Sequence, residues 1–324
     1  MKKILLSLLA LTALAGCSKN ESNETPSGAV PIRLGADVEV SSKAPVISGS
    51  SVEAGIAGWE TTTAVSYATT PTWYDGQIKT TAHPSTGQAV TWENSTQKYY
   101  NADENVTTYL KAWYPRGTVD VSSPTAPKVT FSNTDGSVDA LLAPAISGTK
   151  LDAANKTLAF IHKTAQIKFQ VIAGDGLAAG TKVKSIKLNG VSLPTGFDLT
   201  KDAAADDAVT YTAAAGGALA VTFDKNSGNP IDIPAKGTTA VEVGQPAMIQ
   251  PVADNSTVTL DIVTVKSDGT TTAATYTGKA FTTDNSKIEA GKAYTVTLTF
   301  SQTAVALKAT ITDWTSASGE GTIE

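Results

Sequence analysis

The chain has 324 residues, an apolar fraction of 41% and a formal net charge of −5. This mildly acidic balance argues against a nucleic-acid partner and against a basic patch that would hold an anionic membrane surface. The length suits two domains of ordinary size. After the first residues, no apolar run approaches the roughly 20 residues that a membrane-spanning helix requires.

The first sixteen residues have the pattern of a secretory signal peptide. Lys2 and Lys3 precede an apolar run that is too short to span a bilayer, and small residues follow it. The segment ends in LAGC at 14–17, which resembles a bacterial lipobox. That resemblance implies cleavage before Cys17, acylation of its thiol and amine, and a lipid anchor in a membrane. Cys17 is the only cysteine, so an intramolecular disulfide is excluded.

Residues 18–28 are polar and predict a flexible tether, which gives way to a strongly patterned segment. From Val30 to Val40 apolar residues occupy every second position, which is the period of a half-buried strand. The predicted buried face consists of Val30, Ile32, Leu34, Ala36, Val38 and Val40. Pro31 has no backbone N–H, so we expect this strand to begin at a sheet edge.

Further strand-like segments follow at short intervals, at 107–114, 258–262, 270–276, 294–300 and 305–311. The Ser267-Asp268-Gly269 turn predicts a hairpin. Closely spaced strands separated by turn residues are typical of antiparallel sandwiches. We therefore predict an all-β chain with an N-terminal domain over 29–153 and a C-terminal domain over 154–324.

An apolar block at 158–171 follows this predicted boundary. Leu158 and Phe160 stand at even positions, whereas Ala165, Ile167 and Phe169 stand at odd ones. Because a shift by one residue moves side chains to the other face of a strand, a bulge or bend is expected between Phe160 and Ala165.

The chain offers few side chains for catalysis or metal binding. His83 and His162 are its only histidines. A zinc site would need both of them together with carboxylates, and a Ser-His-Asp triad would need one. His83 precedes Pro84 in a polar loop, and the apolar surroundings of His162 predict a hydrogen-bonded structural residue. We therefore predict no enzyme activity, no cofactor and no metal site.

Aromatic residues are concentrated in the N-terminal part of the chain. Sugars commonly stack on exposed aromatic rings, so a glycan-binding surface is the alternative to simple core packing. The residues concerned are Trp59, Trp73, Tyr74, Trp92, Tyr99 and Tyr100.

Motifs spread along nearly the whole chain resemble the fimbrillin family of Bacteroidales, which are pilin lipoproteins. Besides the lipobox and the Val30–Val40 segment, they are YLKAWYP at 109–115, DALLA at 139–143, FIHKTAQIKF at 160–169, GKAY at 291–294 and ITDW at 311–314. The resemblance implies two transthyretin-like β-sandwich domains in tandem. It also implies an exported outer-membrane lipoprotein that becomes a structural subunit of a fimbrium and supports adhesion.

In that family a trypsin-like protease removes the first strand, and the vacated groove takes a donor strand from the next subunit. For this sequence, the resemblance implies a cut after Lys43, which frees Val30–Val40 completely, with Arg33 as the second choice. The implied donor strand consists of Val305, Leu307, Ala309, Ile311 and Trp314. The same segment is equally the expected last strand of its own domain.

The implied partners are therefore other pilin subunits, a processing protease and a membrane that holds the lipid. A stalk subunit is the leading interpretation. The alternatives are a fimbrial anchor subunit and a monomeric glycan-binding lipoprotein at the cell surface.

Overall fold

The computed structural model describes residues 28–38, 50–81, 87–122, 127–152, 154–223, 228–280, 283, 286–302 and 304–313. These residues form β-strands and three short 3-10 helices, with no α-helix among them, which confirms the predicted all-β class. The 3-10 helices are η1 (Asp206–Ala208), η2 (Ala215–Gly217) and η4 (Asn255–Thr257). The described part of the chain thus contains no helix with the length and apolar character of a membrane crossing.

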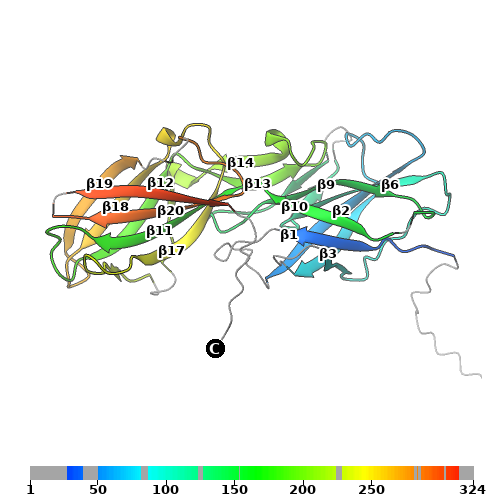
Figure 1. Ribbon diagram of the computed structural model, residues 1–324. Helices are drawn as coiled ribbons and strands as arrows, with labels where there is room; N and C mark the ends of the chain where they lie inside the picture. The colour runs from blue at the N-terminus through cyan, green and yellow to red at the C-terminus, as the bar shows by residue number, and fades with distance from the viewer. Residues whose placement is uncertain are drawn as a thin grey trace, which may run out of the picture.

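An eight-stranded sheet forms the N-terminal half, which is the blue-to-green part of the ribbon at the right of Figure 1. Its spatial order is β4-β1-β10-β9-β6-β2-β3-β5. Its strands are β1 (Leu34–Val38), β2 (Ser51–Thr61), β3 (Trp73–Thr81), β4 (Gln88–Ala89), β5 (Thr91–Trp92), β6 (Thr107–Tyr114), β9 (Leu141–Gly148) and β10 (Lys156–His162). Only Val90 separates β4 from β5, so the sheet curls until its two ends meet. The enclosed core includes Ile56, Leu110, Leu158 and Phe160.

Two sheets packed face to face form the C-terminal half. One has the order β17-β11-β20-β21, and the other has the order β15-β12-β18-β19 with β16 paired to β12. Their strands are β11 (Ala165–Ala173), β12 (Lys182–Asn189), β15 (Ala218–Ala220), β16 (Ile231–Asp232), β17 (Val241–Ile249), β18 (Thr259–Val265), β19 (Thr272–Ala280), β20 (Lys292–Phe300) and β21 (Val305–Asp313). Ile167, Phe169, Ile186, Leu260 and Phe300 lie in the core between them. This half is a β-sandwich.

A fourth sheet joins the two halves. It has the order β14-β13-β8-β7 and consists of β7 (Thr118–Asp120), β8 (Lys128–Thr130), β13 (Ser192–Asp198) and β14 (Val209–Ala213). Trp59 and Trp113 of the N-terminal sheet share one buried cluster with Val129 and Phe197 of this fourth sheet. Because this core draws on both halves of the chain, the joint is a packed interface and not a free linker.

The chain passes from one half to the other between β10 and β11. β10 pairs with β1 and β9, so it belongs to the N-terminal sheet although the sequence placed the domain boundary before it. The expected break in phase between Phe160 and Ala165 is the point where the chain changes sheets, at Lys163 and Thr164. The hairpin expected around 267–269 is the antiparallel β18–β19 pair.

Buried polar groups reinforce this crossing point. The Thr164 hydroxyl donates to Asp139 Oδ1 at 2.8 Å, and His162 Nδ1 lies 2.7 Å from Asp139 Oδ2. All three side chains are buried. His162 is therefore a hydrogen-bonded structural residue, as predicted from its apolar surroundings, because a buried polar group must find a partner.

Two lysines of the N-terminal half donate to backbone carbonyls of the segment between β13 and β14. Lys111 Nζ donates to the carbonyls of Leu199 and Lys201 at 2.8 and 2.7 Å. Lys163 Nζ donates to the carbonyl of Ala205 at 3.0 Å. Burial lowers the pKa of both ammonium groups, and that of Lys111 falls to about 8. Each bond ties the two halves of the chain together.

The Lys111 pKa predicts how the stability of the joint varies with pH. Because this pKa falls from 10.5 to about 8 on folding, the unfolded chain binds more protons between these values. Wild-type stability should therefore rise across this range, by up to about 1 kcal/mol per pH unit, relative to a Lys111→Met variant. Urea unfolding at pH 7, 8.5 and 9.5 measures the difference. Lys187→Met, at an exposed position of β12, should show no such trend. A stability difference between the wild type and Lys111→Met that does not change with pH would contradict the lowered pKa of Lys111.

Candidate functional site

Strand β1 occupies a groove between two other strands. It pairs in parallel with β10 along Leu34–Val38 and in antiparallel with β4 at Gly35 and Ala36. The sequence placed the start of this strand at an open sheet edge, and the structure corrects that expectation. The difference arises because the segment 87–100 folds over the outer side of β1.

The residues just before β1 are held by the same segment. Tyr100 N donates to the Val30 carbonyl at 2.9 Å, and Ile32 N donates to the Lys98 carbonyl at 3.0 Å. Pro31 lies between these two bonds. The pairing does not need an N–H at this position, so proline costs no hydrogen bond here. The N-terminal segment is thus paired from residue 30 onward.

Two side chains also converge on the carbonyl of Ile32. Trp92 Nε1 donates to it at 3.1 Å, and Gln97 Nε2 donates to it at 3.2 Å. Both donors belong to the segment 87–100, so they add side-chain bonds to the backbone pairing. Loss of β1 would deprive both of this acceptor, and any strand that replaced β1 would offer a carbonyl at the same place.

The inward side chains of β1 and its leading residues are almost completely buried. Ile32, Leu34, Ala36 and Val38 are exposed by 1%, 5%, 0% and 2%, and Val30 is half-buried. Burial of the three largest side chains corresponds to about 5–9 kcal/mol of gross hydrophobic stabilisation. This is comparable to the entire stability of an ordinary domain, so an empty groove would be strongly unfavourable.

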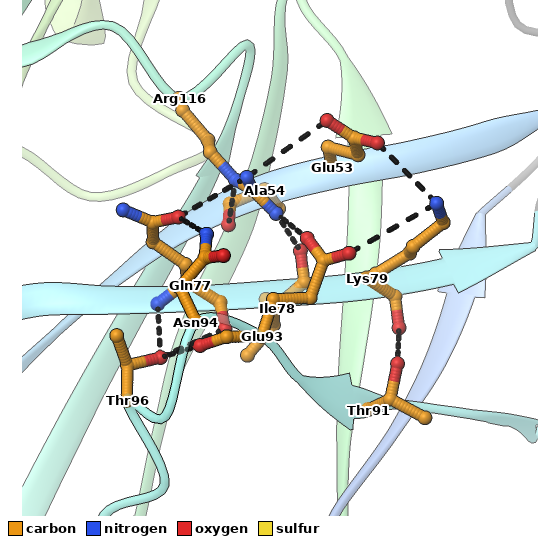
Figure 2. A network of polar contacts seen from close by, with 10 residues as sticks. All are labelled: Glu53, Ala54, Gln77, Ile78, Lys79, Thr91, Glu93, Asn94, Thr96 and Arg116. Carbon is orange, nitrogen blue, oxygen red and sulfur yellow. Dashed lines mark hydrogen bonds and ion pairs between the residues drawn. The ribbon is translucent and has the colours of Figure 1, made fainter.

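The outer wall of the groove is attached to the sheet independently of β1. Arg116 holds it by bonding Glu93 of the segment 87–100 together with Gln77 Oε1 and the carbonyl of Ile78 on β3 (Figure 2). The last two distances are both 3.2 Å. Arg116 also donates to the Ala54 carbonyl on β2 at 3.3 Å. Because these bonds do not involve β1, the wall has its own support when β1 is absent.

Of the two expected protease sites, only Arg33 lies within the described residues. Arg33 is exposed and lies one residue before β1. Lys43, Val40 and the expected acylation site Cys17 lie outside the described residues. Arg116, the other arginine of the chain, is enclosed by the contacts in Figure 2.

The expected donor residues lie on β21. This strand pairs with β20 along its whole length and ends its sheet, so it is the last described strand of its own sandwich. Ala309 is buried, whereas Val305, Leu307 and Ile311 are half-buried. Trp314 lies outside the described residues. The structure therefore brings neither Val305 nor its neighbours on β21 to the groove of the same chain.

The aromatic residues considered for sugar stacking serve mainly in packing. Trp59 and Tyr100 are buried, and Trp73 and Trp92 meet edge to face beside the N-terminal core with ring centroids 6.3 Å apart. Among the six aromatic residues considered, only Tyr74 is exposed. These residues therefore do not form an exposed stack of rings.

The histidines do not gather potential metal ligands. His162 is bound to Asp139, and His83 lies outside the described residues. Within the described ranges, no three His, Cys, Asp or Glu side chains are grouped so that they could hold a metal ion.

The fold and the buried first strand define an all-β sandwich protein in which a strand from the N-terminus completes a sheet. Residues 50–314 match the fimbrillin-like family, and the chain belongs to this family.

Solved structures share this fold. A candidate cell adhesion protein from Bacteroides uniformis is 19% identical with a TM-score of 0.56, over 90% of this chain and 100% of that one. A fimbrial protein from Bacteroides vulgatus is 16% identical with a TM-score of 0.52, over 87% of this chain and 99% of that one. A comparison with curated proteins finds no match.

Removal of the Arg116 guanidinium should loosen the outer wall of the groove. In an Arg116→Met variant, Glu93 loses its closest cationic partner, so we expect a loss of about 1–3 kcal/mol in unfolding free energy. Amide hydrogen exchange should accelerate in the segment 87–100. Lys184→Met, at an exposed position of β12, is the matched control. Unchanged exchange in 87–100 would show that Arg116 does not hold this wall.

Proposed function

We propose that this chain is a structural fimbrial subunit that polymerises by exchanging β1 for a strand of the next subunit. The observation that supports this most is the burial of β1. Four inward side chains are almost fully enclosed, yet the walls around them are formed by β10, β4 and the segment 87–100. A strand from another subunit can fill such a groove through backbone pairing and alternate side chains.

Proteolysis is the proposed trigger. Before the cut, β1 is joined covalently to β2, which gives it a high effective concentration at the groove and keeps the subunit monomeric. A cut after Lys43 turns residues 17–43 into a separate, noncovalently bound peptide that a second subunit can displace. A cut after the exposed Arg33 would leave Leu34–Val38 paired with β10, so Lys43 remains the preferred site.

Export as a lipoprotein precedes this step. Acylation of Cys17 would hold the precursor at the outer membrane, with the polar residues 18–28 as a tether to β1. The same cut would remove the lipid and β1 together, so release from the membrane and competence to polymerise are coupled. Membership of the fimbrillin-like family supports a location at the cell surface.

The joint between the halves supports a stalk role. The shared core around Trp59, Trp113 and Phe197 and the lysine bonds across it make the subunit a stiff unit. We propose that the halves are tandem transthyretin-like sandwiches and that such units transmit force along a fimbrium. An anchor subunit would retain its lipid and β1.

Limited trypsin treatment of the unlipidated precursor tests the trigger. The new N-terminus should be Ala44, and SDS-resistant ladders should appear as the freed strand is displaced. Mass spectrometry and unboiled gels measure the two results. Lys43→Gln should suppress both, whereas the matched Arg33→Gln variant should leave them unchanged. A trimmed chain that stays monomeric, or polymers that retain peptides from 30–43, would refute strand exchange.

A further inference from the structure

The inward residues of β1 and its leading segment share their pattern with those of β21, and we infer that β21 of a second copy enters this groove in a single register. In that register each donor residue takes the place of one residue of the first strand. The four replacements are Val305 for Ile32, Leu307 for Leu34, Ala309 for Ala36 and Ile311 for Val38. The inference rests on the proposed removal of β1.

The small, buried side chain of Ala36 fixes the register. Ala36 is 0% exposed within the N-terminal core, so a larger side chain at its site would meet packed neighbours. Only the stated register puts an alanine there with Leu307 at the site of Leu34. Sliding β21 by two residues in either direction puts Leu307 or Ile311 at the small site.

The same position fixes the direction of the donor. If β21 entered in reverse with Ala309 still at the site of Ala36, Asp313 would occupy the site of Ile32. That site is 1% exposed, and burial of an unpaired carboxylate there would be strongly unfavourable. The donor therefore runs parallel to β10 and antiparallel to β4, as β1 does.

Burial favours the transfer. Among the described strands, β21 pairs only with β20, and Val305, Leu307 and Ile311 are half-buried. The corresponding sites in the groove are at most 5% exposed, and the groove offers backbone partners on both sides. The donor thus exchanges one ladder for two, and its own apolar side chains become more fully buried.

The outward positions of the groove require a local adjustment, because Gly35 is buried. Lys308 would stand at Gly35, where an added Cβ lies 3.1 Å from Asn155 Nδ2 and 3.6 Å from the Gln88 carbonyl. The Asn155 side chain must move by a few tenths of an ångström. Ala306 would take the exposed position of Arg33.

Engineered disulfides between copies test the register. Asp37 pairs with Ala159 on β10, so Thr310 should stand opposite Ala159 in the polymer. Neighbouring strands lie about 5 Å apart, whereas a slip of two residues separates the Cα atoms by about 8 Å, which is too far for a disulfide. Both Ala159 and Thr310 are exposed, and an unlipidated chain lacking Cys17 has no other cysteine.

The experiment compares three double variants after trypsin treatment and mild oxidation. Ala159→Cys with Thr310→Cys should give about tenfold more intersubunit disulfide than Ala159→Cys with Lys308→Cys or with Thr312→Cys. Boiled, non-reducing gels measure the yield. Asp37→Cys with Ala159→Cys should form an intramolecular disulfide in the untreated precursor, which verifies that the site accepts the bond.

The outcomes separate this inference from the proposed function. Polymers that cross-link preferentially through residue 308 or 312, or through none of the three, would overturn the register while leaving strand exchange in place. If trypsin yields no polymers although the Asp37–Ala159 control forms, strand exchange itself fails and the register fails with it.

Discussion

The parallel pairing of β1 with β10 is the interaction on which the N-terminal half depends. It links the first strand of this half to its last, so the curled sheet closes between β10 and β4 only when a strand lies there. Four inward side chains of the first strand then complete the core. The strand is therefore indispensable to the fold, but every contact that holds it is noncovalent apart from its link to β2.

Polar groups in this protein hold the parts that surround β1. Arg116 attaches the segment 87–100 to β2 and β3, while Lys111 and Lys163 attach the segment between β13 and β14 to the N-terminal half. Charge-assisted hydrogen bonds are stronger and more directional than apolar contacts. The scaffold is thus held in fixed geometry by polar bonds, whereas the contacts of β1 are mainly backbone pairing and apolar burial, which another strand of similar pattern can reproduce.

The sequence predicted the positions of the strands far better than it predicted which strands pair with one another. The inward positions of β1 followed from their period of two, because burial of one face imposes that period. Its enclosed position could not be predicted, since β4 and β5 have two residues each and show no periodicity. The pairing of β10 with β1 spans more than a hundred residues of sequence and likewise leaves no local signal. For His162 the burial was predictable, but its partner Asp139 became evident only from the fold.

The proposed strand exchange would impose opposing requirements on β21. A strand fully buried in its own sandwich would leave its domain unstable on departure, whereas a polar strand could not fill a core site. Half-burial on an edge meets both conditions, because the apolar side chains are already present and only one ladder must break. The matching alanines at 36 and 309 add a steric requirement, since each must fit a buried site. The two strands thus share alternating apolar side chains around a central alanine, which is the pattern that the inferred register uses.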